Sequence, residues 1–160
     1  GIDGINLIEV ADTLAALQNA GAVHRARFNV PVTAVTGSNG KTVVKEWLFQ
    51  LLQKKQPVMR RPRSYNSQIG VPLSAWLLSE RHEVAVFEAG ISKPGEMERL
   101  ERIIAPDTGI FTNIGPAHGN NFKDITSKID EKFPKIYSIS QVSTEEKKII
   151  FTRKFELFLI

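Results

Sequence analysis

The apolar residues of this chain fall into short runs that alternate with longer amphipathic stretches. The short runs begin at Val30, Val58, Val84 and Gly109, and the third of them is apolar up to Phe87 without alternation. Such a run is typical of a parallel strand that is covered on both faces. Between the runs, apolar residues recur at helical spacing. This alternation predicts a three-layer α/β domain with a parallel sheet and right-handed crossovers.

Five stretches carry the helical pattern. The first follows Asp12, a candidate N-cap, and the fourth follows Pro94, a residue type that is favoured at helix starts. The predicted helices run from Asp12 to near Phe28, through the stretch that ends at Leu52, from Leu73 to Arg81, from Pro94 to Ile104, and onward from Asp124. His24, on the first helix, is expected at the surface. The pattern predicts a further strand over Lys147 to Thr152 and no structure over residues 138–146.

A glycine-rich loop, Gly37-Ser38-Asn39-Gly40-Lys41-Thr42, joins the first predicted strand to the helix that follows it. Glycines let the backbone turn its N–H groups toward one point, the helix start adds partial positive charge, and Lys41 adds a full charge. A polyphosphate fits this arrangement, and Thr42 would offer its hydroxyl to a Mg²⁺ on the phosphates. Val35 stands where the common phosphate-loop pattern has its first glycine, so this loop is a shortened form. A plain turn is the alternative, but it needs neither the lysine nor the threonine.

Two further predicted strands also end in polar residues. Glu88 ends the third strand, and Asn113 and His118 follow the fourth. The carboxyl ends of parallel strands share one edge of the sheet, where open α/β sheets bind ligands. Glu88 and Thr42 supply the oxygen ligands that Mg²⁺ prefers. For His118, a loop histidine that bonds the backbone is as good an interpretation as a metal ligand.

The composition is that of a globular protein with a basic balance. The 160 residues carry a formal net charge of +4 and no cysteine, so disulfides and thiolate chemistry are excluded. Arg60, Arg61 and Arg63 follow the second predicted strand; a solvated strand end is the simpler interpretation, and contact with an anionic ligand is the alternative. No apolar run approaches the roughly 20 residues of a membrane span, and no charged and apolar leader is recognisable, so we expect a cytoplasmic protein.

Four segments follow one another along residues 12–135: TAVTGSNGKT, SYNSQIGVPLS, FEAG with GEMERL after it, and PDTGIFTNIGPAH. Taken together, in this order and spacing, they resemble the central ATP-binding domain of the Mur ligases. Within that family, the resemblance is strongest to members that add D-alanyl-D-alanine to UDP-N-acetylmuramoyl-tripeptide in peptidoglycan synthesis. It implies an ATP-dependent amide ligase, in which ATP phosphorylates the substrate carboxylate and the amine of the dipeptide attacks the acyl phosphate.

The resemblance also implies roles for residues at matching positions. Lys41 would neutralise the β- and γ-phosphates, Thr42 and Glu88 would hold one Mg²⁺, and His118 would help to hold a second. Lys132, fourteen residues after His118, corresponds to a lysine that the family carbamylates, which turns a cation beside the metal into an anion. The implied nucleotide contacts are Gly37, Ser38, Asn39, Gly40, Lys41, Thr42, Asn66 and Asn113.

The expected organisation is a lead-in with one helix over residues 1–28, the ATP-binding domain over residues 29–135, and a tail over residues 136–160 that departs from the family pattern. The N- and C-terminal domains of the family are missing from this sequence, so the chain alone is expected to be inactive. Two alternatives remain: a nucleotide-binding module without catalysis, and a basic nucleic-acid-binding domain. The second would need aromatic residues interleaved with Lys and Arg, whereas the aromatic residues here lie mostly in apolar stripes.

Overall fold

The centre of the fold is a sheet whose strands lie in the order β2-β3-β1-β4-β5-β6. The computed structural model describes residues 6–61, 64–113, 149–152 and 158–159. The strands are β1 (Val32–Thr36), β2 (Val58–Arg60), β3 (Val84–Glu88), β4 (Thr108–Phe111), β5 (Ile149–Thr152) and β6 (Phe158–Leu159). The strands β2, β3, β1 and β4 are parallel, whereas β5 and β6 are each antiparallel to the strand before them in the sheet. The parallel sheet confirms the fold class expected from the sequence.

The strand order decides which residues meet at the ligand edge. β1 lies between β3 and β4, and Val35 of β1 stands opposite Glu88 at the end of β3. On the other side, Thr36 at the end of β1 stands opposite Phe111 at the end of β4. The loop after β1 is therefore flanked by Glu88 on one side and by the residues that follow β4 on the other, as the sequence predicted.

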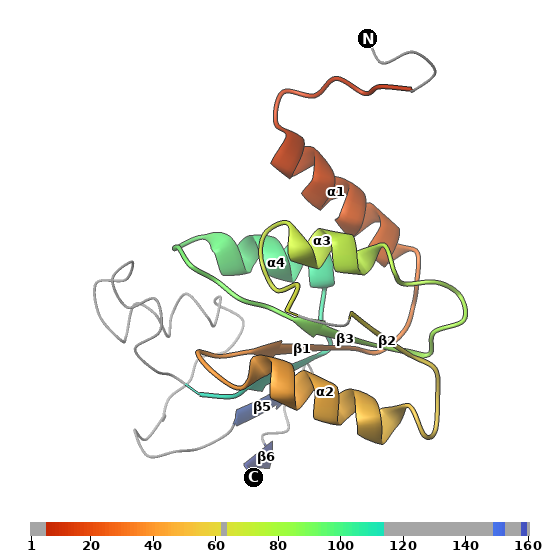
Figure 1. Cartoon of the computed structure of the whole chain (residues 1–160), viewed down its shortest axis with the longest axis vertical. Coiled ribbons are helices and arrows are strands. Elements are labelled where there is room, and N and C mark those ends of the chain that lie inside the picture. The colour runs from red at the N-terminus through yellow and green to blue at the C-terminus, as the bar shows by residue number, and fades with distance from the viewer. Residues whose placement is uncertain (1–5, 62–63, 114–148, 153–157, 160) are drawn as a thin grey trace.

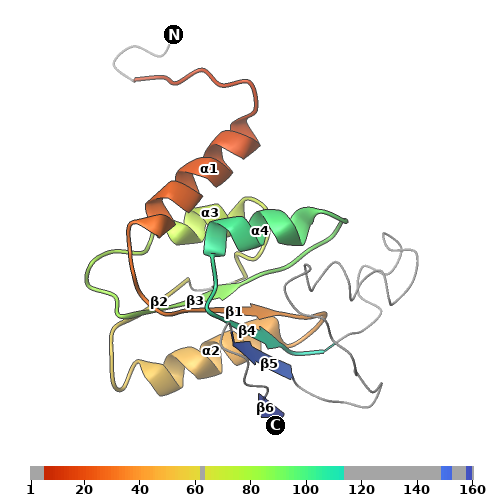
Figure 2. The same cartoon turned by 180° about the vertical axis from the view of Figure 1, so that it is seen from behind.

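Helices cover both faces of the sheet (Figures 1 and 2). They are α1 (Thr13–Ala26), α2 (Lys41–Leu52), α3 (Gly70–Ala75) and α4 (Glu96–Ile104). α2 packs on one face, where it contacts β1, β2 and β3, while α3 and α4 lie together on the other. α1 contacts α3 and α4 and so forms an outer layer beyond them. None of the helices among the described residues is long and apolar enough to cross a membrane.

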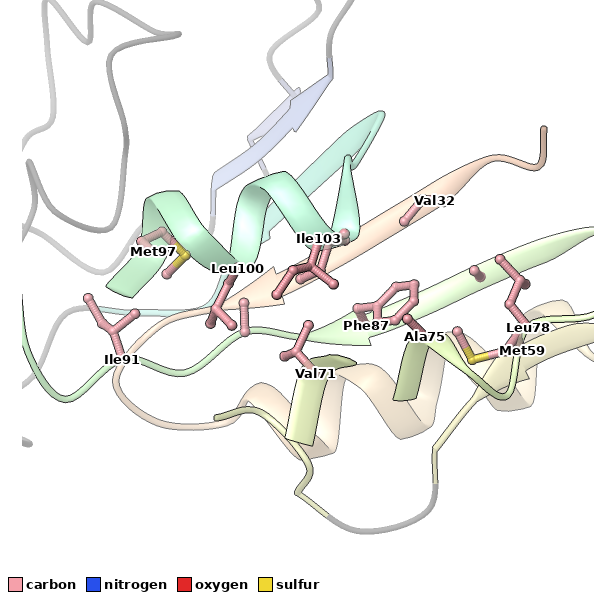
Figure 3. Packing of buried hydrophobic residues seen from close by; sticks show 13 residues of the cluster. Val32, Met59, Val71, Ala75, Leu78, Phe87, Ile91, Met97, Leu100 and Ile103 are labelled. Carbon is pink, nitrogen blue, oxygen red and sulfur yellow. The ribbon is translucent and has the colours of Figure 1, made fainter. Parts of the chain in front are cut away.

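Two hydrophobic clusters hold the layers together. The larger lies between the sheet and the α3–α4 side (Figure 3), where Leu100 and Ile103 of α4 and Val71 of α3 surround Phe87 of β3. The smaller lies under α2 and contains Val35, Val84, Val86, Val44, Leu48, Leu52, Val58 and Ile110. All five residues of β3 are buried because helices cover both of its faces, which explains why its sequence does not alternate.

The helix expected over Leu73 to Arg81 is wrong in its position. α3 spans Gly70–Ala75, so it starts and ends earlier than the apolar spacing predicted. Pro72 falls in the first turn of the helix, where a missing N–H needs no acceptor. The Ser67 hydroxyl accepts from the Gly70 N–H at 3.1 Å and helps to fix this start. Trp76, which lies inside the predicted helix range, follows α3 in the structure and remains 51% exposed.

The first helix begins as predicted, but the surface position expected for His24 is wrong. The Asp12 side chain caps α1 by accepting from the N–H groups of Leu14 and Ala15 at 2.9 and 3.0 Å. His24 is half-buried, and its Nε2 lies 2.9 Å from the Leu78 carbonyl oxygen. Its ring stacks on Trp76 with centroids 4.5 Å apart. α1 therefore docks on the segment after α3 through an aromatic contact that the periodicity of α1 alone does not predict.

Candidate phosphate-loop site

The loop between β1 and α2 needs glycine at both of its glycine positions. Gly37 has a φ of 137°, and a Cβ there would stand 2.1 Å from Thr112 Oγ1. Gly40 has a φ of 79° and is the N-cap of α2, without a side-chain cap. Residues other than glycine rarely adopt these backbone conformations. The two glycines thus allow the chain to turn sharply from the strand into the helix, as the sequence predicted.

Thr112 and Asn113, which follow β4, hold this loop in place. The Asn113 carbonyl oxygen accepts from the Ser38 N–H, and Asn113 Oδ1 accepts from the Asn39 N–H, both at 2.8 Å. Thr112 Oγ1 donates to the carbonyl oxygens of Asn39 at 2.5 Å and Thr36 at 3.2 Å. Because two N–H groups of the loop are bonded to Asn113, an anion at this loop would be met chiefly by the start of α2, whose first N–H groups have no acceptor within the helix.

Lys41, the first residue of α2, lies back over the loop. Its Nζ donates to the carbonyl oxygens of Gly37 at 2.9 Å and Ser38 at 3.2 Å. The ammonium is therefore placed at the mouth of the turn, beside the helix start, where its charge and the helix dipole act in the same direction. A negatively charged group at the loop would meet both.

Thr42 and Glu88 meet across the edge of the sheet. Thr42 Oγ1 lies 3.1 Å from Glu88 Oε1 and 3.0 Å from Glu88 Oε2, and it also lies 2.7 Å from Ser64 Oγ. Glu88 is only 4% exposed. A hydroxyl and a carboxylate side by side are the oxygen donors that Mg²⁺ uses in proteins together with phosphate oxygens and water. Within the described residues, no group of three or more His, Cys, Asp and Glu side chains could hold a metal.

Asn66 lies beside the same carboxylate. Its Nδ2 donates to Glu88 Oε1 at 2.7 Å, and its backbone oxygen accepts from the Gly90 N–H, also at 2.7 Å. A Cβ at Gly90 would approach the Asn66 side chain to 2.9 Å. Gly90 therefore leaves the room that the amide needs, and the loop that carries Asn66 is brought to the site as expected.

Sequence reasoning missed one residue of this cluster, Lys45. Its ammonium lies 3.4 Å from Glu88 Oε2, and its side chain is 2% exposed. The signal that could have identified it is its position on α2: it stands three and seven residues before Leu48 and Leu52, on the apolar face, where a charged side chain needs a partner.

Arg60 and Arg61 are half-buried, so the solvated strand end expected as the simpler interpretation of the arginine cluster is wrong for these two residues. Arg60 pairs with Glu46 at 2.9 Å and lies over the Phe49 ring at 4.0 Å. Arg61 lies over the Tyr65 ring at 3.8 Å and donates to the Leu73 carbonyl oxygen at 3.2 Å. Both guanidinium groups are thus engaged within the chain, and Arg63 lies outside the described residues.

Two of the expected site residues, His118 and Lys132, also lie outside the described residues. The expected contacts that are described all gather around the end of β1. They come from the loop after β1, the start of α2, the segment before α3, the end of β3 and the segment after β4. The geometry is that of a phosphate loop with a carboxylate beside its threonine.

Comparison with known proteins agrees with this geometry. The family model described as the Mur ligase middle domain matches residues 35–154 of the chain. The chain belongs to the Mur ligase family. It is 35% identical over 151 residues to the UDP-N-acetylmuramoyl-tripeptide–D-alanyl-D-alanine ligase of Treponema pallidum. This match covers 94% of this chain and 30% of the relative. The ligase of the same name from Bacillus subtilis is 38% identical over 112 residues, 70% of this chain and 24% of the relative.

Solved structures of Mur ligases share the fold. The crystal structure of MurF from Acinetobacter baumannii superposes with a TM-score of 0.75 at 34% identity, over 78% of this chain and 28% of that one. MurF ligase from Thermotoga maritima, solved in complex with ADP, gives a TM-score of 0.72 at 30% identity, over 82% of this chain and 31% of that one. The chain thus spans about a third or less of the length of these Mur ligases and corresponds to their middle domain.

Proposed function

We propose that this chain is the ATP-binding core of a ligase that adds D-alanyl-D-alanine to UDP-N-acetylmuramoyl-tripeptide in peptidoglycan synthesis. The observation that carries the proposal is the placement of the Thr42 hydroxyl 3.0 Å from a Glu88 carboxylate oxygen, directly after a lysine that lies over a glycine loop. The relatives named for this activity, at 33–39% identity in five bacterial species, support the choice of substrates.

Each residue of the site has a task in this proposal. Gly37 and Gly40 shape the turn, the start of α2 and Lys41 bind the β- and γ-phosphates, and Asn113 fixes the loop. Thr42 and Glu88 would hold a Mg²⁺, whose charge would neutralise the phosphate oxygens. The substrate carboxylate takes the γ-phosphoryl group and ADP leaves; the dipeptide amine then attacks the acyl carbon, so that an amide forms and inorganic phosphate is released. Catalysis of this kind is mainly positioning and electrostatic stabilisation.

His118 and Lys132 complete the proposed site on the basis of the family resemblance. His118 would help to hold a second Mg²⁺, and a carbamate on Lys132 would supply negative charge and oxygen ligands beside it. In the full-length protein, Lys132→Ala should reduce activity severely, and short carboxylic acids should restore part of it. Normal activity of Lys132→Ala would rule out the carbamate.

Calorimetric titration of the chain with ATP, with and without Mg²⁺, tests the nucleotide site. Lys41→Ala should weaken ATP binding in both conditions because a full positive charge is lost from the loop. Glu88→Gln should abolish the gain that Mg²⁺ gives, since the amide keeps the shape and loses the charge. Lys54→Ala, at an exposed position just beyond α2, is the matched control and should bind as the parent does. Unchanged ATP affinity in Lys41→Ala, or an unchanged Mg²⁺ effect in Glu88→Gln, would contradict the proposal.

A nucleotide-binding module without catalysis is the second candidate, favoured for the isolated chain by its coverage of less than a third of its first relative. The ligase relatives are roughly three times as long as this chain, and the additional sequence is where we expect the UDP-sugar and the dipeptide to bind. A nucleic-acid-binding role has less support, because Arg60 and Arg61 are engaged with Glu46, Phe49 and Tyr65. A salt-sensitive stabilisation by DNA or RNA in place of one by Mg²⁺ and ATP would favour it.

A further inference from the structure

Lys45 is a buried charge on the face of α2 that packs against the sheet. It is the one α2 residue that is fully buried, and Val44, Leu48 and Leu52 of the same helix pack against the smaller hydrophobic cluster beneath. An aliphatic side chain would fill this position at no electrostatic cost, whereas an ammonium there must be paired. Its presence needs an explanation other than packing.

The contacts of Lys45 converge on the candidate site. Its Nζ lies 3.0 Å from the Arg61 carbonyl oxygen, 3.4 Å from Glu88 Oε2 and 3.5 Å from Glu46 Oε1. An ammonium has three N–H donors, and these oxygens come from three parts of the chain: α2, the segment after β2 and the end of β3. Lys45 therefore joins the helix that carries Thr42 to the strand that carries Glu88.

Each carboxylate oxygen of Glu88 is held by one protein group and also lies close to the Thr42 hydroxyl. A carboxylate has about four acceptor positions on its two oxygens. Asn66 donates to Oε1 and Lys45 lies beside Oε2, so each oxygen is held by one group of the protein, the first half-buried and the second buried. The remaining acceptor positions are directed to the Thr42 hydroxyl, which lies within 3.1 Å of both oxygens. A carboxylate held in this way presents both oxygens on the side of Thr42.

We propose that Lys45 is a positioning residue for the divalent cation of the nucleotide complex. It acts through Glu88: it fixes the orientation of the carboxylate relative to Thr42 and balances its buried charge when no cation is present. This inference rests on the proposed role of Glu88 as a cation ligand. A small cavity is lined by Lys45, Glu88, Arg61, Tyr65, Ser74, Val86 and Phe87. With the Lys45 ammonium removed, Glu88 Oε2 would lose the charge that holds it, and the carboxylate would turn away from Thr42 more readily.

Calorimetry on the chain tests the inference through the ratio of the ATP dissociation constants without and with Mg²⁺. Lys45→Met keeps the length and apolar stem of the side chain and removes the charge. It should reduce this ratio by about tenfold or more, the usual effect of losing a group that orients a metal ligand, while metal-free ATP binding changes by less than about threefold. Lys45→Arg, which keeps the charge, should restore much of the ratio, and Lys54→Met at an exposed position should leave it unchanged.

A purely structural role would lower thermal stability and leave the ratio in place, so a parent-like ratio in Lys45→Met would overturn the inference. If Lys45→Met fails to fold, Lys45→Gln, whose amide can still donate to the Arg61 carbonyl oxygen, takes its place with the same expected loss. Failure of the proposed function looks different: the parent would then show no Mg²⁺ effect, or Glu88→Gln would retain it. Loss of the Mg²⁺ effect in Glu88→Gln together with its retention in Lys45→Gln and Lys45→Met would refute the role of Lys45 alone.

Discussion

Gly37→Ala is the substitution whose effect follows most directly from the geometry of the phosphate loop. Gly37 has a φ of 137°, a value that residues other than glycine rarely adopt. A Cβ added there would stand 2.1 Å from Thr112 Oγ1 and 3.0 Å from the Asn113 backbone nitrogen. The Thr112 side chain can rotate, but the Asn113 backbone cannot give way without releasing Ser38, whose N–H it accepts at 2.8 Å. The substitution therefore strains the backbone and separates the loop from the segment after β4.

The expected cost combines two effects. A non-glycine residue in a left-handed conformation costs roughly 1–2 kcal/mol. Moving Thr112 Oγ1 breaks the hydrogen bond of its single O–H, which the carbonyl oxygens of Asn39 and Thr36 share, and such a bond contributes about 0.5–1.5 kcal/mol net. Gly37→Ala should thus lower the free energy of unfolding by about 1.5–3.5 kcal/mol, against the roughly 5–15 kcal/mol typical of a domain.

Urea denaturation followed by circular dichroism measures this difference, with Gly95→Ala as the matched control. Gly95 has a φ of 79° and is the N-cap of α4, but a Cβ added there would meet nothing within 4 Å. Gly95→Ala should therefore show the backbone cost alone, about 1–2 kcal/mol. Combining Gly37→Ala with Thr112→Ala should cost less than the sum of the two single changes, because the clash with Oγ1 is then absent.

A loss in Gly37→Ala no larger than the loss in Gly95→Ala would refute this reasoning, since it would mean that the contact with Thr112 costs nothing. Strict additivity of Gly37→Ala and Thr112→Ala would refute it as well. ATP affinity gives an independent measurement on the same variants. Gly37→Ala should weaken ATP binding at temperatures where it remains folded, whereas Gly95→Ala, away from the loop, should not.

Three further outcomes are expected. Arg25→Met should lower the free energy of unfolding by about 2–4 kcal/mol relative to Arg27→Met in urea denaturation, because one buried and two partly buried carbonyl contacts lose their donor. Those acceptors of the Arg25 guanidinium belong to Phe28, Ile104 and Ala105. Burial, and then the charge of Arg81, lowers the pKa of His82 below its usual 6.5. As the pH falls, His82 is therefore protonated in the unfolded chain before it is protonated in the folded chain, so the free energy of unfolding should decline from about pH 6.5 toward the lowered pKa. His82→Gln should flatten this decline. An unchanged dependence of stability on pH in the variant would contradict the prediction. Finally, the chain alone should bind nucleotide but form no amide bond, and phosphate release that depends on both UDP-N-acetylmuramoyl-tripeptide and D-alanyl-D-alanine would show otherwise.

Much of the fold follows from local patterns in the sequence. The order of strands and helices, the N-cap at Asp12 and the uninterrupted apolar run of β3 were predicted, because each depends on residues that are close together in the chain. The meeting of Thr42 with Glu88 was also predictable, since the carboxyl ends of parallel strands share one edge. The ends of the helices were predicted less well. The apolar spacing of Leu73, Trp76 and Leu77 predicted a helix that continues to Arg81, whereas α3 ends at Ala75.

Which side of each helix is covered, and which polar groups meet, depends on how the helices and the sheet pack together. Val43, Trp47 and Leu51 of α2 follow the same helical spacing as Val44, Leu48 and Leu52, yet the first set is at least 50% exposed and the second packs on the sheet. Periodicity places residues on a face but does not show what lies opposite that face.

The same limit explains why Lys45 and the second task of Asn113 were missed. Lys45 meets Glu88 across 43 positions of sequence, and Asn113 binds the Ser38 and Asn39 N–H groups across more than 70. Such pairings depend on the order of strands in the sheet, which places β1 between β3 and β4. The sequence determined the chemistry that each strand end carries, and the packing of the sheet determined which of those groups hold one another in position.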